Sequence, residues 1–319
     1  MKKKWLPIAL GSFITAGSLF TPFSSAFAAS PSFDDIGDHW AESQIRSLAS
    51  QGVINGIDSN TFAPDKPLTK GEFAAMLAKA MKSDLKTSAS PGEARKYFSD
   101  VDSSDYYASD LVRLKKANII DDHGAFHGEG KISRQEMAHY LVNGYNYLYR
   151  DDLSSLVSTN HIPFKDAGQI SSGYKDDVVI ADKINLIGGK NDGSFAPRAS
   201  LTRGEAAAVI YRFIQLVPYE DIGLRASTDL PDKFAAYYKE GKLYITFTYD
   251  LKSAGYNGQI IVITRSGKQL KINVDQVKLD NSSSSSGFEQ MRTIAVKESG
   301  VSQVLLVMNG KETARFNVK

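Results

Sequence analysis

The sequence predicts an α+β protein of more than one domain, in which a mainly α-helical region precedes an antiparallel β-sandwich. Three observations support this prediction. A motif of the form apolar, Ser/Thr, Lys/Arg, any residue, Glu occurs at 68–72, 132–136 and 201–205, and an apolar run follows each copy. Short β-rich runs replace this pattern after about residue 218. A basic and then apolar start is typical of a secretory signal.

The first 28 residues are interpreted as a signal peptide. Lys2-Lys3-Lys4 precede an apolar stretch to about Phe20, and an A-x-A cleavage site ends at Ala28. The alternative, an uncleaved anchor, needs about 20 apolar residues, which is longer than this stretch. Removing 1–28 takes away three lysines and no acids, so the formal net charge changes from +2 to −1.

Composition excludes several classes of function. A near-neutral chain with interspersed charges lacks the basic stripe of a nucleic-acid-binding surface, so no nucleic-acid partner is expected. The chain has no cysteine, which excludes disulfides, thiol nucleophiles and cysteine-ligated metal sites. No second apolar run is long enough to span a membrane.

Aligning the chain on its three motifs shows three repeats. Residues 52–64 match 185–197 without a gap at an offset of 133, whereas the corresponding turn of the middle repeat is two residues shorter. Each repeat opens with Phe and Asp, continues with an aromatic residue and a helix-like segment, and ends with a glycine-containing turn, the motif and a second helix. The repeats are placed at 31–82, 96–149 and 162–217, with Leu77, Leu141 and Ile210 expected in a shared core.

The motif itself combines a structural and a functional expectation. Its Ser/Thr and Glu lie three apart, which is the capping-box pattern at a helix start. Its cation faces the positive end of the helix dipole, an unfavourable placement of about 0.3–1 kcal/mol that capping does not explain. Lys70, Arg134 and Arg203 together with exposed helix-start amides are therefore expected to form anion sites, and neighbouring aromatics suggest an anionic carbohydrate.

Residues 219–319 read as a β domain. Six β-rich runs are separated by turn signals, among which Asn309-Gly310 is a strong two-residue hairpin signal. About 100 residues of short strands predict an antiparallel sandwich of immunoglobulin-like type.

No catalytic, cofactor or metal site is expected. The sequence has no H-E-x-x-H zinc motif, G-x-S-x-G elbow or P-loop. His123 and His127 lack a carboxylate arrangement that would complete a zinc site, and the segment 100–105 departs from a calcium loop at its sixth position.

These residues resemble the S-layer homology domain in its usual triplet, over about 31–217. The resemblance rests on Phe33, Asp35 and Ile36, on His39-Trp40-Ala41, on Gly189, Asp192-Gly193, Phe195 and Pro197, and on Thr202-Arg203-Gly204-Glu205. It implies a pseudo-threefold assembly with a central three-helix bundle and grooves between neighbouring units. It also implies binding of a peptidoglycan-linked secondary cell-wall polysaccharide, with a pyruvylated N-acetylmannosamine carboxylate at the motif arginine.

The site residues implied are Arg203, Arg134, Lys70, Trp40, Asp35, Asp100, Asp166, Gly56 and Gly189. The departures from the family pattern fall mostly in the middle repeat and at Lys70, because lysine lacks the bidentate fork of arginine. The cations are therefore ranked Arg203, Arg134, Lys70.

The function expected is that of a secreted, non-catalytic protein anchored non-covalently to the cell wall and displaying its β domain. Two alternatives stay open: a wall-targeted enzyme whose catalytic part is the β domain, and a subunit of an S-layer lattice.

Overall fold

A computed structural model describes residues 32–149, 157, 162–216, 219–226, 234–251, 256–278, 288–308 and 310–319. The expected signal peptide and the expected domain junction at 217–218 lie outside these ranges. None of the helices within them has the length and hydrophobicity that crossing a membrane requires.

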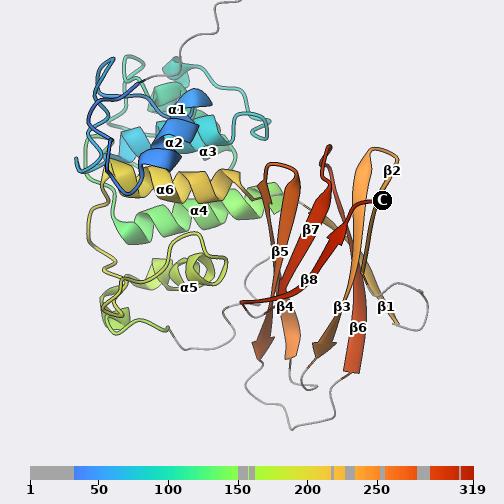
Figure 1. The fold of residues 1–319 in the computed structure, drawn as a ribbon. Helices are drawn as coiled ribbons and strands as arrows, with labels where there is room; N and C mark the ends of the chain where they lie inside the picture. Colours follow the sequence, from blue (N-terminus) through green and yellow to red (C-terminus); the bar gives the residue numbers. More distant parts are fainter. Residues whose placement is uncertain are drawn as a thin grey trace, which may run out of the picture.

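The helices occupy the N-terminal part of the chain and the strands the C-terminal part (Figure 1). The helices are α1 (Glu42–Ser50), α2 (Lys70–Ala80), α3 (Ala108–Lys116), α4 (Arg134–Tyr149), α5 (Lys175–Lys183) and α6 (Arg203–Ile214). The strands are β1 (Tyr219–Ala226), β2 (Phe234–Lys239), β3 (Lys242–Leu251), β4 (Tyr256–Ser266), β5 (Gln269–Lys278), β6 (Phe288–Val296), β7 (Gln303–Met308) and β8 (Lys311–Asn317). The α+β class is thus confirmed.

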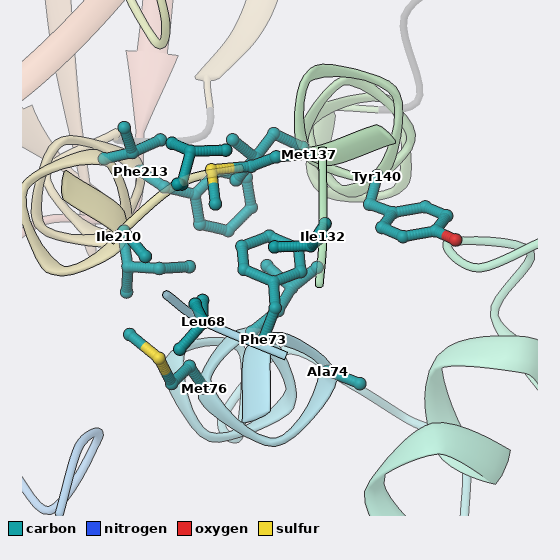
Figure 2. Packing of buried hydrophobic residues seen from close by; sticks show 14 of the residues in the cluster. Leu68, Phe73, Ala74, Met76, Ile132, Met137, Tyr140, Ile210 and Phe213 are labelled. Atoms are coloured by element: carbon teal, nitrogen blue, oxygen red, sulfur yellow. The ribbon is translucent and has the colours of Figure 1, made fainter. Parts of the chain in front are cut away.

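The second helices of the three repeats, α2, α4 and α6, pack around one core. Figure 2 shows Phe73, Met137 and Phe213 meeting between them. Leu77, Leu141 and Ile210 are fully buried, as expected from their equivalent positions. Burying side chains of this size stabilises the fold by about 1.5–3 kcal/mol each.

Short backbone bridges join the three motif segments to one another. Residues Pro67 and Thr202, Thr69 and Lys131, and Ser133 and Ser200 pair as isolated antiparallel bridges. Each motif segment therefore contacts both others, and the start of each helix is fixed relative to its neighbours.

The β domain consists of two four-stranded sheets in the orders β1-β6-β3-β2 and β4-β5-β7-β8. Apolar side chains from both sheets form one cluster, including Ile245 and Phe247 from one sheet and Ile263 and Ile272 from the other. Strands β7 and β8 pair antiparallel on either side of the expected hairpin turn, where Gly310 has φ +76°. The expectation of a purely antiparallel domain is wrong at one pair, since β5 and β7 run parallel. Strand β6 lies between them in the chain and belongs to the other sheet, so the crossover returns in the same direction as β5.

The α-helical part ends against the second sheet. Leu216 forms an isolated bridge with Thr264, and the amide of Arg265 donates to the Gln215 carbonyl at 3.0 Å. The end of the third repeat is thereby hydrogen-bonded to strand β4.

Candidate functional site: grooves between the repeats

Capping boxes begin α2 and α6, as the motif predicts. The Thr69 and Thr202 hydroxyls accept from the amides of Glu72 and Glu205, whose carboxylates accept from the threonine amides in return. Ser133 and Glu136 make the same reciprocal contacts before α4.

The expectation of free amides at these helix starts is wrong. The first two amides of α6, those of Arg203 and Gly204, donate to the carbonyls of Lys66 and Pro64 in the first repeat at 2.9 and 2.8 Å. The starts of α2 and α4 are satisfied in the same way by carbonyls of a neighbouring repeat. An anion at these positions would therefore be held by the cation and not by the helix-start amides.

Arg203 reaches from the third repeat into the first. Its Nε donates to the Phe62 carbonyl, Nη2 to the Asn55 carbonyl and Nη1 to Glu72, each at 2.8 Å. The guanidinium lies 4.6 Å from the centroid of the Phe62 ring, and the residue is 6% exposed. These contacts use three of its five N–H bonds, which leaves one on each terminal nitrogen.

Arg134 makes the equivalent contacts between the second and third repeats. Its Nε and Nη2 donate to the carbonyls of Phe195 and Gly188, both at 2.7 Å, and its guanidinium lies 5.0 Å from the Phe195 ring centroid. Burial lowers the pKa of this guanidinium, with Glu205 and Asp166 opposing the shift. The arginines are thus structural links between repeats as well as candidate ligands of an anion.

Lys70 occupies the third such position, between the first and second repeats. Its Nζ lies 3.2 Å from Asp122 and 3.4 Å from Glu136, above the Phe126 ring. Lys70 thus contacts the Asp122 carboxylate where the arginines contact main-chain carbonyls, while its contact with Glu136 is equivalent to that of Arg203 with Glu72. The three cations mark three equivalent junctions between repeats, called here the Arg203, Arg134 and Lys70 grooves.

The three predicted aspartates organise the turn of their own repeat. Asp35, Asp100 and Asp166 each accept two consecutive main-chain amides, those of 62–63, 126–127 and 195–196, at 2.6–2.9 Å. Burial raises the pKa of Asp166, but the two amides outweigh it, and the pKa lies below its ordinary value. A structural role accounts for all three.

The two predicted glycines are required by close packing. A Cβ on Gly56 would lie 2.3 Å from the Asp58 carbonyl oxygen, and one on Gly189 would lie 2.7 Å from the Phe164 ring. Both glycines line grooves. They allow the turn to lie close to the cation.

Each of the two arginine grooves is assembled from all three repeats. The Arg203 groove has a volume of about 470 Å³ and combines the turn and α2 of the first repeat with Arg203 of the third and Tyr106 of the second. The Arg134 groove, of about 610 Å³, combines the turn and α6 of the third repeat with Arg134 of the second and Trp40 of the first. Trp40 and Tyr106 are 61% and 65% exposed, so apolar ring surface is presented to solvent at both grooves.

The two arginine grooves also have the same balance of charge. Three cations and one carboxylate line each of them: Lys66, Lys79, Arg203 and Glu72 in one, and Lys190, Arg212, Arg134 and Glu205 in the other. Tyr106, Lys79 and Arg212 were not predicted as site residues. Lys79 and Arg212 share one repeat position, seven residues after the capping glutamate, and that equivalence could have identified them.

Comparison with known proteins finds a family match in two parts of the repeat region. Residues 32–74 and 163–207 match the S-layer homology domain, so the matched segments lie in the first and third repeats. The resemblance stated from the motifs is confirmed. Within the described residues, no group of His, Asp and Glu is arranged to hold a metal ion.

Several relatives align with about three fifths of this chain. They include an exoglucanase XynX of Acetivibrio thermocellus (34% identical over 60% of this chain), an amylopullulanase of Thermoanaerobacterium thermosulfurigenes (32% over 60%) and an S-layer protein of Bacillus thuringiensis subsp. finitimus (30% over 62%). The alignments span only 17%, 10% and 23% of those proteins' own lengths. The S-layer homology domains and the S-layer relatives point to a secreted protein of the cell surface, and the domains themselves imply anchoring to the cell wall.

Proposed function

We propose that the chain anchors itself to the cell wall by binding an anionic, pyruvylated secondary cell-wall polysaccharide in its Arg203 and Arg134 grooves. The main support is the common construction of these two grooves. Each has a buried arginine, an excess of cations and an exposed aromatic ring contributed by a different repeat. A carboxylated sugar matches this combination, because its carboxylate pairs with a cation and its ring face packs on an aromatic.

The buried arginine suits a carboxylate in particular. Three main-chain or side-chain acceptors already hold the Arg203 guanidinium in place, and an N–H bond remains on each terminal nitrogen. Two N–H bonds of a fixed guanidinium can grip both oxygens of a carboxylate without a further loss of rotamer entropy. A buried environment strengthens that contact, since water screens it little.

The equivalent positions of the three cations also support a proposal for the arrangement of the repeats. We infer that the three repeats are related by an approximate threefold axis, with α2, α4 and α6 as its central bundle. The β domain is proposed to be an immunoglobulin-like sandwich in which the β5–β7 pair is parallel. The repeats would occupy 31–82, 96–149 and 162–217, and the β domain 219–319.

We propose that the β domain is displayed and non-catalytic. The names of some relatives are those of glycosidases, which favours the alternative that the β domain carries an enzyme targeted by the repeats. Hydrolysis of cell-wall or plant polysaccharides by the purified chain would support that alternative. A lattice-forming S-layer subunit is the other alternative, and two-dimensional arrays of purified protein would support it.

Sedimentation with cell-wall sacculi tests the proposed function. The purified chain is expected to pellet with intact sacculi and to stay in the supernatant after the polysaccharide has been stripped from them. Equal binding to intact and stripped sacculi would contradict the proposed ligand. Added pyruvylated N-acetylmannosamine glycoside should release the bound protein, whereas N-acetylmannosamine without pyruvate should not.

A further inference from the structure

The Lys70 groove keeps the capping glutamate and the turn phenylalanine of the other two, but it differs from them at three positions near its cation. Gly56 and Gly189 of the arginine grooves correspond to Asp122, so a carboxylate stands where the other turns have no side chain. On the helices, Ala75 and Met76 of α2 and Ala208 and Val209 of α6 correspond to His139 and Tyr140 of α4.

Asp122 makes the contacts that an anionic ligand would make. One carboxylate oxygen lies 3.2 Å from Lys70 Nζ, and the other accepts a hydrogen bond from the Tyr140 hydroxyl. Tyr140 is 2% exposed, and its ring stacks on Phe73 of the shared core with the two centroids 6.3 Å apart. Its ring centroid lies 6.0 Å from Lys70 Nζ and its hydroxyl holds Asp122 beside the cation, whereas Met76 and Val209 at the equivalent positions offer no such donor.

The charge of this groove also opposes an anion. His139 lies between two carboxylates, with Nδ1 2.6 Å from Asp177 and Nε2 2.8 Å from Asp121. Both ring nitrogens face acceptors, so the imidazole is held as its cation. Four carboxylates, those of Asp121, Asp122, Glu136 and Asp177, thus stand against three cations, namely Lys70, His139 and Lys115, whose Nζ donates to the main-chain carbonyls of 121 and 122. In each arginine groove three cations accompany one carboxylate.

We propose that Asp122 is a built-in occupant of the third anion site, which closes the Lys70 groove to the polysaccharide and leaves two binding grooves per chain. This inference rests on the proposed function, since it concerns the same ligand. Lys70 then serves to join the first and second repeats through Asp122 and Glu136.

Calorimetric titration of the full chain with a pyruvylated N-acetylmannosamine glycoside tests this inference. The wild-type chain is expected to bind two molecules. A variant that imports the residues of the third repeat, Asp122→Gly with His139→Ala and Tyr140→Val, is expected to bind three. Should that variant fail to fold, Asp122→Asn removes the competing charge alone and is expected to add a weaker third site.

Three bound molecules on the wild-type chain would overturn the inference, because the ligand would then enter the groove despite Asp122. Two bound molecules on a folded variant would overturn it as well, because Asp122 would not be what closes the groove. No binding by the wild-type chain would instead contradict the proposed function. The two failures are therefore distinguishable in one series of titrations.

Discussion

Replacing Arg203 by alanine should destabilise the repeat region strongly, although the residue was first identified as a candidate ligand contact. The substitution leaves the carbonyls of Phe62 and Asn55 without the Arg203 donor and leaves Glu72 without its ion-pair partner. These contacts are shielded from water, since Arg203 is only 6% exposed. Removing one partner of a buried ion pair costs about 3–5 kcal/mol. The lost hydrogen bonds belong to the same network, so their separate costs of about 1–3 kcal/mol overlap with that figure. We expect the free energy of unfolding to fall by about 3–5 kcal/mol.

Urea unfolding followed by far-UV circular dichroism measures this loss, because the helices lie in the repeat region. Arg46→Ala is the matched control, since Arg46 lies on the helix surface and pairs with the exposed Glu42 four residues earlier. An exposed pair of this kind contributes about 0.3–0.5 kcal/mol. A loss of less than about 1 kcal/mol for Arg203→Ala would refute the argument that this arginine links the repeats. It would also refute the prediction that the repeat region needs the guanidinium to fold stably.

Three further changes test other parts of the structure. Asp35→Asn should cost about 1–3 kcal/mol, because an amide offers one acceptor oxygen to the two main-chain amides that the carboxylate holds; an unchanged urea midpoint would contradict this. Gly56→Ala should cost about 1–3 kcal/mol through overpacking, whereas Gly37→Ala, where a Cβ would meet nothing within 4 Å, should change the midpoint little; equal effects would contradict the packing argument. Burial lowers the pKa of His139, but Asp177 and Asp121 together raise it to about 9 from its ordinary value of 6.5. Its stabilisation is complete below pH 6.5 and is lost as the pH rises to about 9, so stability should fall across this window and His139→Gln should flatten the fall.

The sequence was sufficient to predict the local parts of this fold. The capping boxes at Thr69 and Thr202, the buried Leu77 and Ile210 and the hairpin before β8 all follow from residues close together in the chain. Local hydrogen bonding and periodicity determine such features, and they need no knowledge of the neighbouring repeat.

The function of the motif cation was only partly predictable. The unfavourable position of the cation at a helix start suggested an external anion. In the structure, however, both arginines donate hydrogen bonds to main-chain carbonyls of another repeat. Arg203 and the Asn55 carbonyl are 148 positions apart in the chain. No local pattern encodes such a contact, which depends on how the repeats close around one another.

The sequence was sufficient to predict that the Lys70 groove differs from the other two, but not which contacts cause the difference. The lysine at position 70 and the shorter middle turn indicated that one groove departs from the others. Aligning the repeats shows that Asp122 stands where the other two have glycine. Its hydrogen bonds to Lys70 and Tyr140, however, depend on how the first repeat packs on the second. The parallel β5–β7 pair was missed for a similar reason, since alternation and turns specify strands and not their partners.

The most direct test of wall binding through the two arginine grooves is sedimentation of the variant Trp40→Ala with Tyr106→Ala on intact sacculi. Both rings are largely exposed, so the unfolding midpoint should stay close to that of the wild-type chain. The loss of one aromatic contact in each groove, about 0.5–1.5 kcal/mol, predicts up to about tenfold weaker binding at each site and a larger loss for a chain held at both. Tyr237→Ala, an exposed aromatic on the β domain, serves as the control and should bind as the wild-type chain does. Wild-type sedimentation by the folded double variant would contradict the account.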